Sequence, residues 1–150
     1  MAKLWRSIVC QRVITDSQLN TATYVDGVEG FGVPQLPFVF LPVMVGTVWR
    51  RDQVEDKIVA RLRVRGPSGA DVFVNNLPDV PMASDVHRYN VQIGGFNIVE
   101  AGDYEIIVDQ RMGEEWKPVS VLPVYVQVAA IPVVMAIPAP ALAPQAPVNQ

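Results

Sequence analysis

Apolar and charged residues alternate with a period of two in this chain, and that alternation restricts its fold more than any other feature. It is clearest in residues 57–65, KIVARLRVR. One face of this segment holds Ile58, Ala60, Leu62 and Val64. The opposite face holds Lys57, Arg61, Arg63 and Arg65 together with Val59. Because successive side chains of a strand point to opposite faces of a sheet, the segment is predicted to be a strand with one buried face.

Residues 103–109 alternate in the same way but carry acidic side chains. The predicted inward face holds Tyr104, Ile106 and Val108. The predicted outward face holds Asp103, Glu105 and Asp109 together with Ile107. Opposite charges on neighbouring strands stabilise pairing by about 0.2–1 kcal/mol each. The basic row Lys57, Arg61, Arg63 and Arg65 would satisfy this acidic row if the two strands were neighbours, which the sequence leaves open.

Strand signals dominate the rest of the chain, and no stretch of a dozen residues has a convincing helical period. Eight strands are predicted, at residues 4–14, 21–31, 38–49, 57–65, 70–74, 86–93, 103–110 and 116–128. Turn signals that recur about every 8 to 12 residues are typical of an all-β sandwich or barrel. Strands with one wet face favour the sandwich. The predicted fold is a single antiparallel immunoglobulin-like β-sandwich.

The C-terminal segment differs in kind from the predicted sandwich of residues 1–128. Residues 129–150, AAIPVVMAIPAPALAPQAPVNQ, contain five prolines in 22 residues and no charged side chain. Proline removes a hydrogen-bond donor and favours the extended polyproline II conformation. We therefore expect a Pro/Ala-rich tail that is flexible or docked on the surface. The repeated prolines also count against a transmembrane helix, and no membrane partner is expected.

Charge and cysteine content limit the function classes further. The formal net charge of −3 indicates no dedicated nucleic-acid binding, which normally uses a basic patch or stripe. Cys10 is the one cysteine, so neither an internal disulfide nor a cysteine-based zinc cluster can form. The N-terminal apolar run is too short for a signal peptide. We expect a cytoplasmic protein.

Several stretches together resemble a known family. They are SIVCQRVITDSQLNTATYVDGVEGF, LPFVFLPVMVGTVW, DKIVARLRVRGPSGADVF, HRYNVQIGGFNIVEAGDYEIIVDQ and WKPVSVLPVYVQV. From Leu4 to Val128 the chain resembles an uncharacterised family of small bacterial immunoglobulin-like β-sandwich proteins. The positions that carry the resemblance are Asp16, Pro37, Pro67, Gly69, Gly102 and Tyr104. The resemblance implies a fold and no activity.

His87 is the only histidine and the first candidate for chemistry. Asp85 precedes it by two residues and would share its face of a strand. A catalytic role needs a nucleophile, and nothing in the spacing ties Ser84 or Cys10 to His87. A surface or hydrogen-bonded histidine is the favoured interpretation.

Acidic loops and the basic row offer weaker candidates. Asp52, Glu55 and Asp56 could bind calcium, but Arg50, Arg51 and Lys57 flank and neutralise them. The pair Asp26 and Glu29 is equally unspecific. The basic row has no aromatic residue for base stacking, so a solvated or charge-paired face is favoured. Gly102 and Tyr104 resemble a tyrosine corner, in which a buried ring has a hydrogen-bonded hydroxyl.

These observations favour a non-enzymatic protein-interaction or scaffold module that binds a protein partner or itself through an edge strand, its loops or the tail. One alternative is a structural subunit of a larger assembly, such as a shell or a phage-derived particle. Another is a small enzyme or metal-binding protein with a loop site at Asp79, Asp85, His87 and Arg88. No catalytic, cofactor-binding or metal-binding residue is assigned, and no small-molecule ligand is expected.

Overall fold

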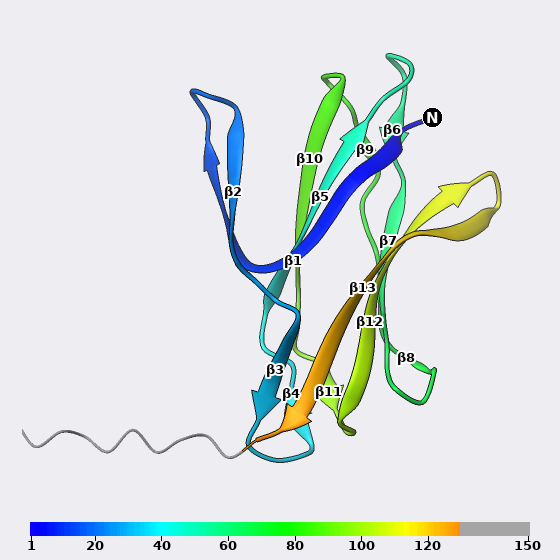
Figure 1. Ribbon diagram of the computed structural model, residues 1–150. Coiled ribbons are helices and arrows are strands. Elements are labelled where there is room, and N and C mark those ends of the chain that lie inside the picture. The colour runs from blue at the N-terminus through cyan, green and yellow to red at the C-terminus, as the bar shows by residue number, and fades with distance from the viewer. Residues whose placement is uncertain (130–150) are drawn as a thin grey trace, which may run out of the picture.

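The computed structural model describes residues 1–129, and these residues form strands, turns and loops without any helix (Figure 1). The all-β prediction is therefore confirmed. Of the predicted tail, all but Ala129 lies outside the described residues.

A four-stranded antiparallel sheet holds the N-terminal part of the chain. Its order is β10 (Val86–Ile93), β5 (Val43–Arg50), β1 (Lys3–Asp16) and β2 (Thr21–Gly27). The first part of β1 pairs with β5 as far as Cys10, where the pairing with β2 begins. Beyond Cys10 the strands β1 and β2 pair only with each other, so they form a two-stranded arm. Figure 1 shows this arm projecting from the body in blue.

A five-stranded sheet holds most of the C-terminal part. Its order is β3 (Gly30–Val33), β13 (Glu115–Val128), β12 (Gly102–Met112), β7 (Ala60–Arg65) and β8 (Asp71–Asn76). Two short ribbons complete the described structure. They are β4 (Phe38–Val39) with β11 (Asn97–Ile98), and β6 (Lys57–Ile58) with β9 (Val80–Pro81).

The two large sheets share one hydrophobic core. The four-stranded sheet contributes Val9, Val45, Trp49 and Ile93 to it. The five-stranded sheet contributes Leu62, Val64, Tyr104, Ile106, Val108, Val124 and Val126. The inward faces predicted for residues 57–65 and 103–109 are thus confirmed, since Ile58, Ala60, Leu62 and Val64 are all buried as well. Each fully buried aliphatic side chain contributes about 1.5–3 kcal/mol, so these alternating residues hold the sheets together.

All eight predicted segments contain strand, and three of them are divided. Residues 21–31 divide at Val28, where the chain leaves β2 and crosses to the other sheet. Residues 38–49 divide before Val43, next to Pro42, which has no N–H for a ladder bond. Residues 57–65 divide at Val59, whose carbonyl accepts the N–H of Arg111 instead. The ribbons also place β9 and β11 in segments where no strand was predicted.

The prediction of a wholly antiparallel structure is wrong for one pair of strands. The strands β3 and β13 are parallel, with Tyr125 opposite Gly30 and Val128 opposite Val33. The crossing after β2 is the reason, because it brings β3 to the edge of the five-stranded sheet in the same direction as β13. Gly30 permits the close approach, since a Cβ there would lie 2.7 Å from the carbonyl oxygen of Tyr125.

Tyr104 forms the predicted corner at the start of β12. Its ring is buried, and its hydroxyl donates to the backbone carbonyl of Glu100 over 2.8 Å. Burial raises the pKa of this hydroxyl, so it remains a donor. Gly102 has a φ of 133°, a left-handed value that favours glycine, and a Cβ there would lie 3.1 Å from Pro67.

Replacing Tyr104 by Phe should lower the free energy of unfolding by about 1–2 kcal/mol, because the partly buried carbonyl of Glu100 loses its donor. Urea denaturation of the two proteins measures the difference. Tyr125→Phe is the matched control, since that ring is half exposed and its change should leave the midpoint unaltered. Equal midpoints for Tyr104→Phe and the parent protein would contradict the structural role of the hydroxyl.

Candidate functional site

Two charged surfaces lie on the outer faces of the two sheets, and in the first the basic row meets the acidic row, which the sequence had left open. The strands β7 and β12 are neighbours, with Arg61 opposite Asp109 and Arg65 opposite Glu105. Asp109 is fully buried and accepts hydrogen bonds from Arg61 Nε at 2.9 Å and Arg63 Nε at 2.6 Å. Arg63 Nη2 binds the second carboxylate oxygen at 3.0 Å, which makes this pair bidentate.

Further groups extend this network along the sheet. Arg63 also binds Asp71 at 3.0 Å, and Arg65 lies 3.5 Å from Glu105. Lys57 was predicted to belong to the basic row, but it lies on β6 and pairs with Asp79 instead. Asp103 faces Tyr125 and forms no ion pair within the described part of the chain.

An aromatic ring does reach the basic row, from a different strand. The guanidinium of Arg61 lies over the ring of Trp116 in β13, at 4.8 Å from its centre. Burial of Asp109 would raise the pKa of its carboxyl, but the hydrogen bonds from Arg63 and Arg61 outweigh burial and lower this pKa. The carboxylate therefore stays ionised and neutralises the cations around it. This surface stabilises the sheet, because its arginines already pair with carboxylates of the same sheet.

The structure places Cys10 away from His87, whereas Ser84 and Asp85 stay close to His87 in the chain and have local contacts of their own. His87 lies on β10 opposite Trp49, whereas Cys10 lies on β1 opposite Met44, five residues further along β5. Asp85 is exposed and pairs with Arg51 at 3.0 Å. The hydroxyl of Ser84 donates to the carbonyl of Val86.

Cys10 has the character of a structural thiol. Its side chain is buried, and burial raises the pKa of the thiol. A thiol with a raised pKa supplies little thiolate near neutral pH and is a poor nucleophile.

The acidic loop is engaged by the start of the chain. Asp56 binds the amino group of Met1 at 2.9 Å, and this contact lowers the pKa of its carboxyl. It also accepts the backbone N–H groups of Asp52 and Gln53. Asp52 pairs with Lys3 at 2.9 Å. Within residues 1–129, no group of three or more His, Cys, Asp or Glu side chains is placed to hold a metal ion.

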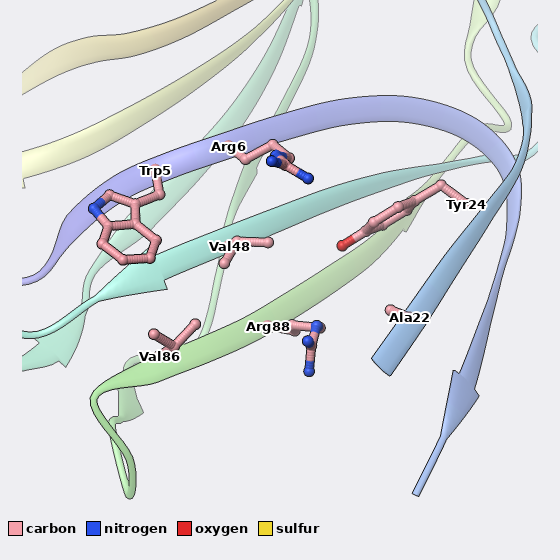
Figure 2. A pocket seen from close by; sticks show the side chains of 7 residues that line it. All are labelled: Trp5, Arg6, Ala22, Tyr24, Val48, Val86 and Arg88. Carbon is pink, nitrogen blue, oxygen red and sulfur yellow. The ribbon is translucent and has the colours of Figure 1, made fainter. Parts of the chain in front are cut away.

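The second charged surface is a hollow of about 450 Å³ on the outer face of the four-stranded sheet. Four strands line it, as Figure 2 shows: Trp5 and Arg6 from β1, Val48 from β5, Val86 and Arg88 from β10, and Ala22 and Tyr24 from β2. The arm bends over the sheet, and Arg88 Nη1 donates to Asn20 Oδ1 in its turn at 3.0 Å. We call this site the arginine hollow.

Local backbone features shape the arginine hollow. The register of β1 against β5 shifts between Leu4 and Arg6, and this bulge leaves Trp5 57% exposed. The guanidinium of Arg50 lies over the Trp5 ring at 5.0 Å. Gly46 forms the floor beneath Tyr24, where a Cβ would lie 2.5 Å from the tyrosine ring. A glycine is therefore required for the ring to lie across the sheet.

The arginine hollow has a positive lining with unused polar groups. Its lining includes two arginines and no carboxylate. Arg6, Arg50 and Arg88 form no ion pair within residues 1–129, and residues 130–150 carry no charged side chain. Within residues 1–129, Tyr24 Oη in the lining and Asn90 Oδ1 beside Gly46 are buried without a hydrogen-bond partner. Such a lining can bind an anionic group and hydrogen-bond to it.

Sequence reasoning missed the arginine hollow. Its lining comes from four segments between residues 5 and 88, and no motif links them. The available signal was Trp5 beside Arg6 near the start of a strand, but the bulge that exposes Trp5 cannot be read from the pattern.

Comparisons with known proteins add no relative. No protein-family model matches the chain, and no curated protein matches it significantly. No helix in residues 1–129 is long and apolar enough to cross a membrane.

Replacing Asp109 by Asn should lower the free energy of unfolding by about 3 kcal/mol at pH 7, because Arg61 and Arg63 lose a buried partner. The folded-state pKa of Asp109 is lowered, so its contribution is complete above the unfolded-state pKa of about 3.9 and is lost as the pH falls below that value. The difference between the two proteins should therefore shrink below about pH 4.

Urea denaturation between pH 7 and pH 3 measures this dependence. Asp71→Asn is the control, because a more exposed carboxylate should contribute about 1 kcal/mol or less. A difference for Asp109→Asn that stays constant down to pH 3 would show that the pair does not act through charge.

Proposed function

We propose that this protein is a non-catalytic protein-interaction module that binds an acidic, extended segment of a partner protein in the arginine hollow. The observation that carries the proposal is the contrast between the two charged surfaces. The arginines of β7 are paired with carboxylates, whereas Arg6, Arg50 and Arg88 form no ion pair within residues 1–129. The chain has a net charge of −3, yet this surface carries arginines with no carboxylate beside them. It is therefore suited to a partner that supplies negatively charged side chains.

The chemistry of the arginine hollow favours a peptide carboxylate. A guanidinium binds a carboxylate through two parallel hydrogen bonds, and it retains its charge at any physiological pH. The Tyr24 side chain points into the hollow (Figure 2), and its hydroxyl is buried without a hydrogen-bond partner within residues 1–129. Trp5, Val48 and Val86 supply apolar area for the side chains between the acidic residues. Aromatic residues and arginine are the types that contribute most to binding at protein interfaces.

The local contacts of the candidate catalytic residues also support a binding role. Cys10 pairs five residues along β5 from His87, Asp85 pairs with Arg51, and the hydroxyl of Ser84 donates to the carbonyl of Val86. The arginine hollow contains no nucleophile next to a base, which acyl or phosphoryl transfer through a covalent intermediate would require.

We also propose that the body is an immunoglobulin-like β-sandwich of the small bacterial family that the sequence resembles. Two sheets with one shared core and the corner at Tyr104 support this fold. A cytoplasmic location is consistent with a single, buried cysteine.

A second candidate function is a structural subunit that assembles with copies of itself. The arm favours it, because its strands pair only with each other and Ile14 and Leu19 on it are largely exposed. An arm of this kind can pack on a neighbouring subunit. Light scattering over a range of concentrations tests it, and a monomer at all concentrations would remove it.

The binding proposal is tested by calorimetric titration with an octaglutamate peptide at low salt. We expect binding that weakens as salt is added. The double variant Arg6→Glu/Arg88→Glu should lose affinity at least tenfold, because both positively charged guanidinium groups are replaced by carboxylates. The matched control is Arg111→Glu/Lys117→Glu, which makes the same charge change on the exposed β12–β13 hairpin. This control should bind almost as well as the parent protein.

Two outcomes would contradict the proposal. Equal losses in the two double variants would show that only net charge matters. A single-stranded oligothymidine that binds the arginine hollow more tightly than the peptide would assign the site to nucleic acid.

A further inference from the structure

A second hollow lies on another part of the molecule, where the chain crosses from the four-stranded to the five-stranded sheet. It has a volume of about 230 Å³, and its apolar lining includes Gly30, Phe31, Gly32, Phe38, Leu41 and Pro42. Leu41 is 62% exposed, and the adjacent Val39 is also largely exposed. We call this site the crossover groove. The arginine hollow shares no residue with it.

The described chain ends against one wall of the crossover groove. The last residues of β13 run parallel to β3, and the N–H of Ala129 donates to the carbonyl of Val33 at 3.0 Å. The Cβ of Ala129 lies 3.2 Å from the position that a Cβ on Gly32 would occupy. The described chain therefore ends beside the groove.

The residues that follow have the composition that such a groove binds. Residues 130–150 contain no charged side chain, and their prolines are Pro132, Pro138, Pro140, Pro144 and Pro147. Proline-rich segments bind to grooves lined by aromatic and apolar side chains, because the polyproline II conformation is populated before binding and little entropy is lost. Phe31, Phe38 and Leu41 provide such a lining.

Charge distinguishes this groove from the arginine hollow. Asp26 is the one charged residue in its lining, so the acidic segment proposed for the arginine hollow would be repelled here. An uncharged apolar segment is not repelled.

We propose that residues 130–150 bind in the crossover groove of their own chain. The covalent link places the segment beside the groove at an effective concentration in the millimolar range, so even a weak contact is occupied. Six residues in the polyproline II conformation span about 19 Å, so the segment has ample length to cover the groove. The tail then covers the exposed side chain of Leu41.

Paramagnetic relaxation in the full-length protein tests this inference. A nitroxide is attached to Ala136→Cys or to Ala141→Cys in a Cys10→Ala background, and amide signals are recorded for the labelled protein. We expect at least one label to broaden the amides of Gly30, Gly32 and Leu41 strongly. The amide signals of Val86 and Arg88 should remain sharp, because these residues lie on β10, which lines the arginine hollow and not the crossover groove.

A groove variant provides the matched comparison. Leu41→Asp should reduce the broadening to the level that the covalent link alone produces, because it places a charge where the apolar segment binds. Val54→Asp makes the same kind of change at a residue that is 77% exposed and outside the groove, and it should leave the broadening intact.

Two results would overturn the inference. One is broadening that is absent with both labels or spread evenly over the surface. The other is broadening that appears on isotope-labelled protein when unlabelled nitroxide protein is mixed with it, since the segment would then bind a second copy. Neither result bears on the arginine hollow, which the peptide titration tests separately.

Discussion

The packing of alternate side chains from β12 onto the opposite sheet is the constraint on which the rest of the structure depends. On one face of β12, Tyr104, Ile106 and Val108 enter the shared core. On the other face, Asp109 lies at the centre of the arginine network. Because one strand serves both faces, a shift of register by one residue would expose the aliphatic side chains and bury acidic ones without partners. The network therefore contributes to the choice of register as well as to stability.

The sequence predicted the strands well because their pattern is local. Period-two alternation identified the buried faces of β7 and β12, and a short glycine–tyrosine motif identified the corner at Tyr104. The pairing of β7 with β12, the parallel β3 and the divisions next to Pro42 and Val59 depend on which strands become neighbours. That choice is made by long-range packing, which a single sequence does not display.

The candidate site could not be predicted for a related reason. Trp5 and Arg88 are far apart in the chain, and they line one hollow only because β1 and β10 flank β5 and the arm bends over them. The basic row on β7 is apparent in the sequence because its arginines lie on one short segment, yet they pair with Asp109, Asp71 and Glu105. The arginines of β7 form ion pairs within the sheet, and their role is therefore to stabilise it. Arg6, Arg50 and Arg88 form no ion pair within residues 1–129, are scattered along the sequence and come together only in the folded protein.

The position of β12 in the five-stranded sheet also bears on how the chain folds as it is synthesised. The four-stranded sheet has all its strands once Ile93 has left the ribosome, but β12 and β13 follow only at residues 102–128. Until then, the inner faces of β1, β5 and β10 have only the β7–β8 hairpin to cover them. The nascent chain thus carries a partly open apolar surface for the time taken to translate residues 94–128, and this is the interval in which a chaperone would bind it.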